Sequence, residues 1–400
     1  MGMYFKATDI LLPKTDSMEA WAVIACDQFT SDKEYWKRVR SNAEGRLSTL
    51  HMILPEAELA TATDATIDAI NACMRKYLED HVFTEYKDAF VYIERTLVDG
   101  SIRQGVIGAV DLENYDYDPS KHPMICATEL TVLERIPPRV AVRKDAQLEF
   151  SHVLLLCEDP EALLIEKIAA QKDVLPKLYE FDLMEGGGHI AAWLVQGDAA
   201  QKFAAALDQY EQKNTYLVGD GNHSLVTAKT IYEQLKKDVP EEISATHPAR
   251  YAMVELENVH SPAMVFEPIH RVLTNTDPVK LLKDIKTICG SDGTAVKWFM
   301  GKESGTIYID TPKGELTVGV LQDFLDSWMK ENAAEIDYIH GDDAVATLGR
   351  ADNAIGFLLP GMSKSDLFPF VQAGRTLPRK TFSMGHGCEK RYYLEGRKIK

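Results

Sequence analysis

A polar turn in the stretch "TYLVGDGNHSLVTAK" (215–229) holds the residue types best suited to chemistry in this sequence. Gly219 and Gly221 allow the backbone to bend and to approach a ligand closely. Asp220 or Asn222 can cap a following helix, because both side chains accept hydrogen bonds from its first amides. The N–H groups and dipole of such a helix bind anions, and His223 adds a cationic or proton-donating group there. The turn predicts an anion or nucleotide site, although these residue types are also common in ordinary turns.

A second polar pair, His270 and Arg271, follows an expected strand in "MVFEPIHRVL". An arginine at a strand end can bind a phosphate or carboxylate through two parallel hydrogen bonds. The alternative is a histidine bonded to the backbone beside a surface arginine, which is the more common role of isolated residues of these types.

A basic island in this acidic chain lies in "GRTLPRKTFS", where Arg379, Lys380 and Thr381 are neighbours. These side chains suit a phosphate clamp, and the alternative is a solvated loop.

A further segment, "ICATELTVLER", carries both signs of charge: Glu129 offers a carboxylate for Mg²⁺ or for general-base catalysis, and Arg135 offers a cation. The alternative is an ordinary helix face with an ion pair. Asp27 and Gln28, in a polar turn near the N-terminus, are expected to face the same cleft.

The same segments resemble the family known as domain of unknown function 1015. "GDGNHSLVTAK" is similar to its D-G-H-H-R-Y-x-T-A stretch, "PAMVFEPIHRVL" to its P-T-H-R segment, "RTLPRKTFS" to M-P-x-K-S-T, and "ATELTVLER" to H-E-x-T…D-R. The order agrees from about residue 5 to the end of the chain. The chain departs from the pattern at Asn222, Ser224 and Thr128, which stand where the family has His, Arg and His. Ser224 can therefore contact a phosphate only as a neutral donor.

The resemblance implies no settled biochemical role. The D-G-H-H-R turn of the family also resembles the phosphate-binding turn of the ParB and sulfiredoxin superfamily. Members of that superfamily bind CTP, ATP or ADP, and some are free-serine kinases. This resemblance implies a nucleotide ligand and a ParB/sulfiredoxin-like nucleus in the fold.

Two classes of function remain open. The first is a nucleotide-binding enzyme, similar to amino-acid kinases, that transfers a phosphoryl group to a small molecule. Asp220 would act as base or metal ligand, His223 as phosphate or proton contact and Glu129 as support for Mg²⁺. The other ligand contacts would come from a set shared by both lobes: Gly221, Asn222, Ser224, Arg135, His270, Arg271, Arg379, Lys380 and Thr381. Such an inventory is sufficient in principle, because phosphoryl transfer depends mostly on positioning and electrostatics.

The second class is a non-catalytic protein that binds a nucleotide or small acid, with Asp220 only as a helix cap. A metal-assisted hydrolase with Asp220, His223 and Glu129 as ligands is a further alternative, although no metal-ligand spacing is evident. The cofactor stays open, with Mg²⁺ bound together with a nucleotide as one candidate. The oligomeric state is not fixed by the sequence either, and a homodimer is one candidate.

The composition limits the classes of molecule that the protein is expected to bind. The formal net charge of −17 argues against binding to nucleic acid or an anionic membrane surface, because phosphate backbones require a basic face. No apolar run approaches the roughly 20 residues that span a bilayer. The six cysteines are scattered and form no CxxC pair, which favours a reducing cytoplasm.

The pattern of elements predicts an α+β fold with mixed, largely antiparallel sheets and flanking helices. Hairpins are expected around Asp99-Gly100, around Gly186 to Gly188 and within 305–319, and a helix is expected to begin at Asp159-Pro160. The polar, proline-broken segment 239–250 predicts a boundary between a lobe at 1–240, with the polar turn, and a lobe at 241–400, with the other basic segments.

Overall fold

The computed structural model describes residues 3–25, 29, 32–59 and 61–400. It divides the chain into two compact units, one ending at Met264 and joined by His386–Lys400, and one spanning Val265–Gly385. This division differs from the expected lobes 1–240 and 241–400. Strand β12 (Tyr251–Asn258) is hydrogen-bonded between two strands of the first unit's sheet, so the chain cannot leave that unit near residue 240.

Within the described residues the first unit forms one 13-stranded sheet. Its main strand order is β5-β6-β11-β8-β12-β4-β3-β2-β19-β7, with β1 paired to β4, and β10 paired to β3 and β9. The pairs β5–β6, β6–β11 and β8–β12 are parallel, and the other pairs are antiparallel. The remaining strand bounds are β1 Phe5–Lys6, β2 Thr8–Pro13, β3 Phe83–Thr96, β4 Ile102–Asp111, β5 Tyr115–Asp116, β6 Ile125–Ala127, β7 Leu148–Phe150, β8 Leu154–Cys157, β9 Lys177–Asp182, β10 His189–Val195, β11 Tyr216–Asp220 and β19 Gly396–Lys398.

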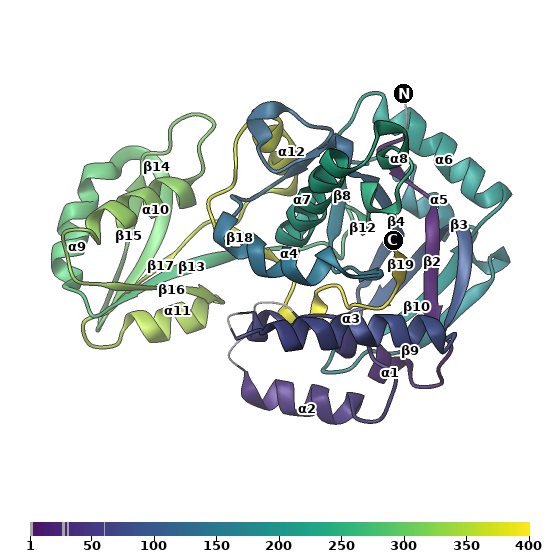
Figure 1. The fold of residues 1–400 in the computed structure, drawn as a ribbon. Coiled ribbons are helices and arrows are strands. Elements are labelled where there is room, and N and C mark those ends of the chain that lie inside the picture. The colour runs from purple at the N-terminus through teal and green to yellow at the C-terminus, as the bar shows by residue number, and fades with distance from the viewer. Residues whose placement is uncertain (1–2, 26–28, 30–31, 60) are drawn as a thin grey trace. The chain divides into compact units, whose positions relative to one another are not determined.

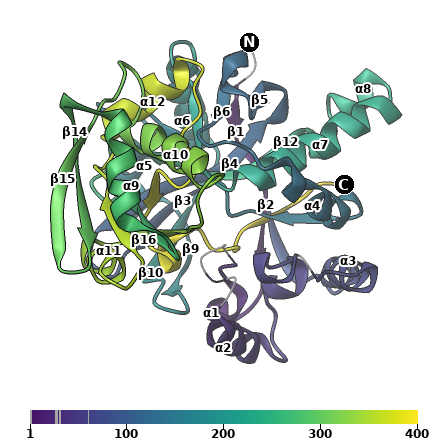
Figure 2. The same ribbon diagram turned by 90° about the vertical axis from the view of Figure 1, so that its left-hand side faces the viewer.

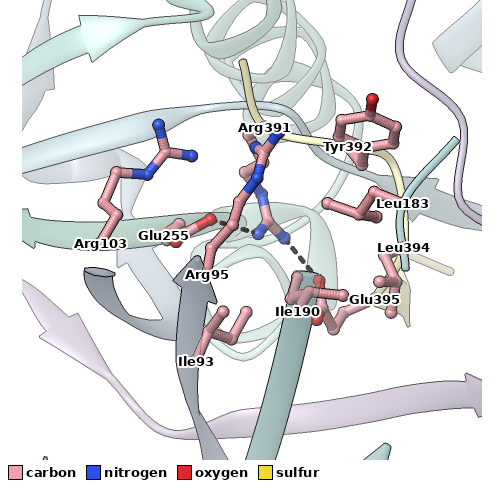
Figure 3. A pocket seen from close by; sticks show the side chains of 10 residues that line it. All are labelled: Ile93, Arg95, Arg103, Leu183, Ile190, Glu255, Arg391, Tyr392, Leu394 and Glu395. Carbon is pink, nitrogen blue, oxygen red and sulfur yellow. Dashed lines mark hydrogen bonds and ion pairs between the residues drawn. The ribbon is translucent and has the colours of Figure 1, made fainter. Parts of the chain in front are cut away.

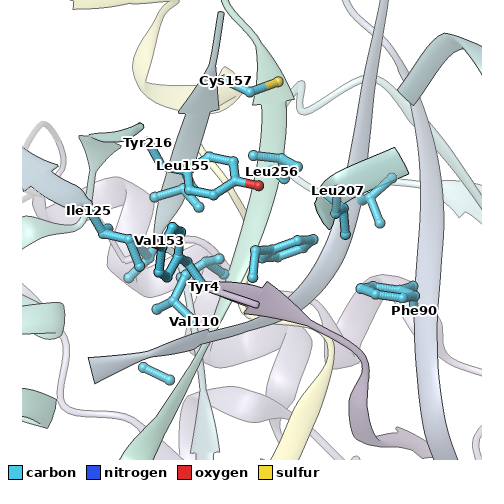
Figure 4. Close-up of a cluster of buried hydrophobic side chains, with 14 of the residues drawn as sticks. Tyr4, Phe90, Val110, Ile125, Val153, Leu155, Cys157, Leu207, Tyr216 and Leu256 are labelled. Atoms are coloured by element: carbon cyan, nitrogen blue, oxygen red, sulfur yellow. The ribbon is translucent and has the colours of Figure 1, made fainter. Parts of the chain in front are cut away.

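Both faces of this sheet are buried. Neighbouring residues along a strand point to opposite faces, and here both sets are apolar. On β3, Phe90 and Tyr92 join one core, and Val91 and Ile93 join the other. The first core packs against α6 and α7, and part of it is drawn in Figure 4. The second core packs against α2 and α3 (Figure 1). The helices of this unit are α1 Met18–Trp21, α2 Lys33–Ala43, α3 Asp64–Glu79, α4 Ile136–Lys144, α5 Ile165–Ala169, α6 Asp198–Glu211, α7 Asn222–Asp238 and α8 Glu241–Ser244.

The second unit is built on a six-stranded sheet with main order β15-β14-β17-β13-β16, and β18 pairs with β13. Ile355 and Phe357 on β17 belong to one core with residues of α9 and α10; both helices are labelled in Figure 2. Between Ile355 and Phe357, Gly356 faces Val345 of α11 on the opposite side. The element bounds are β13 Phe266–Thr274, β14 Cys289–Met300, β15 Glu303–Ile309, β16 Glu335–His340, β17 Ile355–Leu358, β18 Phe382–Met384, α9 Pro278–Asp284, α10 Thr317–Trp328, α11 Asp342–Gly349 and α12 Lys364–Gln372.

The expected α+β class is confirmed, with helices on mixed and mostly antiparallel sheets. The hairpins β3–β4 and β9–β10 turn where Asp99-Gly100 and Gly186 to Gly188 were expected. No helix within the described residues is both long and apolar enough to cross a membrane.

Two expected elements are wrong. No helix begins at Asp159-Pro160, because the Asp159 carboxylate accepts hydrogen bonds from the amides of Leu163 and Leu164, and α5 starts only at Ile165. Ala162, with φ of 55°, interrupts the helical backbone between them. The hairpin expected within 305–319 instead joins β14 to β15, and residues 317–319 already belong to α10.

Candidate functional site

The polar turn connects β11 to α7 as the sequence predicts. Gly221 takes a left-handed conformation with φ of 77°, and a Cβ placed there would lie 2.9 Å from the Cα of Val153 on the neighbouring chain segment. Both observations require glycine. The missing side chain makes room for Val153, so the close approach is to the protein's own backbone.

Asp220 is the partly exposed acid at this turn. Its Oδ1 accepts a hydrogen bond from the Gly221 amide at 2.7 Å, and its Oδ2 lies 3.1 Å from the Nζ of Lys390. About a third of its side chain, 31%, is exposed. Burial raises the pKa of the Asp220 carboxyl, but Lys390, His152 and the Gly221 amide together outweigh burial and hold that pKa below its usual value. Asp220 is therefore an ionised carboxylate at neutral pH.

The expectation that Asp220 or Asn222 caps the helix is wrong. Gly221 occupies the capping position, and the Asp220 carboxylate is used by Gly221 and Lys390. Asn222 is already the first helical residue, and its side chain accepts from the Tyr115 hydroxyl at 2.6 Å and donates to the Thr131 hydroxyl at 2.8 Å.

Sequence reasoning missed Lys390 and His152 as members of this site. Lys390 is 8% exposed and reaches Asp220 from the C-terminal segment. The ring centroid of His152 lies 5.0 Å from the ring centroid of Tyr393, which belongs to the same C-terminal segment as Lys390. Burial lowers the pKa of His152, and the nearby Asp220 opposes this change. Ser224 is a neutral donor where the family has arginine, and no spacing pattern in the sequence points to Lys390 as the cation near this turn.

The segment after β6 is bonded to the turn at three points. Thr128 donates its hydroxyl to the Val218 carbonyl at 2.8 Å, Thr131 accepts from Asn222, and the Val132 amide donates to His223 Nε2 at 3.2 Å. The structure thus brings together two of the segments that carry the family resemblance.

Glu129 shares the turn's edge of the sheet. In the parallel register of β6 and β11, Ala127 is opposite Val218, so Glu129 and Asp220 both lie two residues beyond a matched pair. Arg135 ends a short 3₁₀ helix, η6 (Leu133–Arg135), and is exposed. Ser224 lies in the first turn of α7, where its amide bonds the Gly221 carbonyl at 3.0 Å. Their ligand roles stay predictions.

His270 and Arg271 lie in the second unit, on β13, and both are buried. His270 Nδ1 accepts from the Leu359 amide at 3.0 Å, and its Nε2 lies 3.3 Å from Asp342 Oδ1. Arg271 is 0% exposed, and burial lowers its pKa to about 10. Its guanidinium donates to Gln322 Oε1 at 2.7 Å and to main-chain carbonyls.

Arg271 holds the basic loop of the second unit. Its guanidinium donates to the carbonyls of Lys380 at 3.1 Å and Arg379 at 3.3 Å. Thr381 is buried and donates its hydroxyl to the Pro378 carbonyl at 2.6 Å. The side chain of Arg379 is exposed and bonds the Tyr338 hydroxyl at 2.9 Å. The phosphate contacts expected from this loop and from Arg271 stay predictions.

No three His, Cys, Asp or Glu side chains within the described ranges form a group that could hold a metal ion. Asp220, His223 and Glu129 therefore do not form the ligand set that a metal-assisted hydrolase needs. Asp27 and Gln28, expected to face the same cleft, lie outside the described residues.

Solved structures with remote similarity include a free serine kinase in complex with AMP, at 12% identity and a TM-score of 0.38, covering 73% of this chain and 90% of the other. SbnI with a C-terminal truncation, from Staphylococcus aureus, matches at 11% identity and a TM-score of 0.36, covering 69% and 81%. A conserved hypothetical protein from Pyrococcus furiosus matches at 12% and 0.35, covering 73% and 94%. Similarity at this level establishes neither a shared fold nor a shared function. A search of curated proteins found no match.

A family sequence model described as "Protein of unknown function (DUF1015)" matches residues 6–358. The match includes the turn at Asp220, the segment of Glu129 and the pair His270-Arg271, and it ends before the basic loop at Arg379. With most of its length and three of the four resembling segments inside the match, the chain belongs to the DUF1015 family.

Proposed function

We propose that this protein is an enzyme that binds a nucleotide at the start of α7 and transfers a phosphoryl group to a small molecule. One observation carries the proposal. The partly exposed Asp220 carboxylate is paired at 3.1 Å with the buried Lys390 ammonium where β11 enters α7. An ionised acid and a cation are thus held together at the point where a helix directs its first N–H groups outward.

Each group has a task in such a reaction. The Asp220 carboxylate orients the acceptor hydroxyl and takes its proton as the phosphoryl group is transferred. The Lys390 ammonium and the first amides of α7 stabilise the negative charge on the transferred group. Phosphoryl transfer needs little more than this positioning and charge stabilisation. If Mg²⁺ accompanies the nucleotide, Glu129 on the same sheet edge is the carboxylate suited to support it.

A non-catalytic binding protein is the second candidate. In that case Asp220 was expected to serve only as a helix cap, whereas its carboxylate bonds Gly221 and Lys390 and does not cap α7. The arrangement of Asp220 therefore favours a chemical role over a purely structural one.

The test combines binding and turnover. Wild-type protein is titrated with ATP, ADP and AMP, with and without Mg²⁺, in a thermal-shift assay. A ligand at about 100 times its Kd stabilises the folded state by roughly 2.7 kcal/mol. Phosphoryl transfer is then followed with a panel of hydroxyl-bearing small molecules, amino acids included.

Asp220→Asn should keep nucleotide affinity within about threefold and lower turnover at least about 100-fold, the usual size of a general-base contribution. Asp208→Asn, which changes an exposed aspartate on α6, is the matched control and should leave both quantities unchanged. Nucleotide binding without turnover in the wild type would support the binding protein instead. Absence of nucleotide binding, or full turnover in Asp220→Asn, would refute the proposal.

A further inference from the structure

The C-terminal segment of the first unit is fixed by two buried arginines. Arg95 on β3 donates from Nε to the Gly187 carbonyl at 2.9 Å, and from Nη1 to the carbonyls of Glu389 at 3.0 Å and Lys390 at 2.8 Å. Arg103 on β4 donates to the Glu389 carbonyl at 2.8 Å. The main chain of Glu389 and Lys390 is therefore bonded to the central sheet.

A third arginine, Arg391, directly follows Lys390 and fixes the C-terminal segment through its own side chain. Arg391 donates to the Ser151 carbonyl at 2.9 Å. It also donates to Glu255 Oε2 at 2.7 Å and to Glu395 Oε2 at 2.8 Å (Figure 3). Arg391 is 4% exposed and Glu395 is 0% exposed. Because Ser151 precedes His152, this contact also joins the C-terminal segment to the chain that carries the histidine near Asp220.

The strand register explains how three arginines share one interior. Arg95 and Arg103 lie directly opposite each other on β3 and β4 and would repel without acidic neighbours. The Glu255 side chain comes from β12 and fills the space left by Gly105 on the neighbouring strand β4, since a Cβ at Gly105 would lie 2.4 Å from the Glu255 carboxylate. The cavity between these side chains measures about 10 Å³, close to the minimum for one water molecule. The cluster is a support and has no room for a ligand of nucleotide size.

We propose that Arg95, Arg103 and Arg391 form a clamp whose role is to hold the Lys390 ammonium against Asp220, so that the charge and orientation of Asp220 depend on the C-terminal segment. In this arrangement the three clamp arginines are positioning residues: they touch no substrate and act on Asp220 through Lys390. Buried, multiply bonded arginines keep their rotamers fixed, which makes them suitable for presenting a neighbouring side chain at a set distance. The inference rests on the proposed function for its role in catalysis, but the effect on Asp220 can be measured without a substrate.

Among the side chains of the described residues, Lys390 and His152 have the largest effects on the charge of Asp220. Arg139, Glu56 and Arg391 act in turn on His152. Since burial alone raises the pKa of Asp220, removal of the Lys390 charge should move that pKa upward.

The experiment is a titration of the Asp220 carboxyl carbon by NMR in the full-length protein labelled at aspartate, with Asp220→Asn to assign the signal. Lys390→Met should shift the Asp220 pKa upward, and Lys390→Arg should keep most of the original value. Lys398→Met removes an exposed lysine of the same C-terminal segment, which pairs with Glu85 at 3.0 Å, and should leave the Asp220 pKa unchanged. An unchanged Asp220 pKa in Lys390→Met would overturn the inference.

The clamp is tested by Arg95→Lys, which keeps the positive charge and loses the forked donor geometry. It should shift the Asp220 pKa in the same direction as Lys390→Met but less. If Arg95→Lys does not fold, it is replaced by Arg103→Lys, which loses the bond to the Glu389 carbonyl and the guanidinium 3.0 Å from Glu257 Oε1. A clamp variant that folds and leaves the Asp220 pKa at its wild-type value would refute the clamp.

Kinetics separate this inference from the proposed function. In Lys390→Met the acidic limb of the kcat/KM profile should move to higher pH together with the Asp220 pKa, whereas a merely structural loss would lower activity equally at all pH values. If the protein shows no turnover but Lys390→Met shifts the Asp220 pKa, the proposed function fails and the inference holds. If turnover is present and the pKa does not move, the inference fails and the function holds.

Discussion

Two groups of charged residues, one in each unit, use their side chains in opposite ways. At the turn of the first unit, the Asp220 carboxylate is partly exposed and its partner is a side-chain ammonium. On β13 of the second unit, Arg271 is fully buried and its donors go to Gln322 and to carbonyls, including those of Arg379 and Lys380. The first arrangement leaves charge that a ligand can reach, and the second uses charge to hold a loop.

The comparison shows that a polar motif in a sequence does not reveal whether its charge is available. Both groups were expected to bind phosphate because their residue types suit it. Burial and the destination of each hydrogen bond separate a carboxylate that can react from a guanidinium that shapes the backbone. Variants that remove one group at a time can test whether this distinction holds.

The largest effect should follow from Arg271→Met. The substitution leaves the carbonyls of Ile269, Arg379 and Lys380 and the Gln322 amide oxygen without their buried donor. Unpaired buried acceptors cost about 1 to 3 kcal/mol each before relaxation, so we expect a loss of about 3 to 5 kcal/mol in unfolding free energy. Urea denaturation measures this loss.

Arg379→Met is the control for Arg271→Met. The Arg379 side chain is exposed and donates to the Tyr338 hydroxyl, so its loss should change the unfolding free energy by less than about 1 kcal/mol. If Arg271→Met instead keeps wild-type stability and weakens phosphate binding, Arg271 is a ligand contact and the contrast between the two units fails.

The next largest effect should come from Gly221→Ala. Alanine there must adopt a φ of 77° and would bring Cβ to 2.9 Å from the Val153 backbone. Gly45→Ala is the matched control, because Gly45 has a φ of 68° with no atom within 4 Å of its Cβ position. We expect about 1 kcal/mol of destabilisation from the conformation alone at Gly45 and about 2 to 3 kcal/mol at Gly221. Equal losses in the two variants would show that the contact with Val153 relaxes freely.

Much of the fold follows from the sequence, because hydrophobic periodicity and turn chemistry are local signals. Asp99-Gly100 marks the β3–β4 hairpin, and the spacing of Leu225, Ala228 and Tyr232 marks the buried face of α7. The failures also have local causes. Asp159 looks like a helix cap, but its carboxylate bonds amides before a helix that begins later. The long strand β14, whose sequence begins with two glycines among polar residues, carries little strand signal.

The site could be predicted only in part. Asp220 and its turn are visible because Gly, Asp and Asn gather between a strand and a helix. Lys390 and His152 are invisible, since they reach Asp220 from segments 170 and 68 residues away and belong to no motif. The boundary between the units was also hidden, because β12 follows a proline-broken loop and still returns to the first sheet.

A smaller effect, with a defined pH dependence, should follow from Glu257→Gln. Burial, only partly offset by Arg103, raises the pKa of Glu257 from 4.5 to about 7. Its Oε1 lies 3.0 Å from Arg103 Nε, close enough for an ion pair but not aligned as a hydrogen bond. Between pH 4.5 and 7 the folded protein binds more protons than the unfolded chain at this residue, so its contribution to stability falls as pH rises through that range.

Glu257→Gln removes this dependence and should therefore be about 1 to 2 kcal/mol more stable than the wild type at pH 8, with the advantage shrinking toward pH 5. Urea denaturation at both pH values measures the difference. A variant that is less stable than the wild type at pH 8 would mean that the ion pair with Arg103 outweighs the cost of burying the charge. The buried charges of Glu257 and Arg103 would then stabilise the fold, and would not lower the unfolding free energy.

The smallest effect tests whether the Asp220 turn and the segment of Glu129 behave as one structure. Thr131→Val removes the hydroxyl that accepts from Asn222 at 2.8 Å while keeping the side-chain shape. Because Asn222 is partly exposed, the unfolding free energy should fall by about 1 kcal/mol. The control is Thr246→Val, at an exposed threonine, which should lower the unfolding free energy by less. Combined with Asn222→Ala, the two substitutions should show a coupling free energy of about 0.5 to 1 kcal/mol. Additive losses would mean that Glu129 is attached to Asp220 only through the strand pairing, and its place in the site would then depend on the sheet register alone.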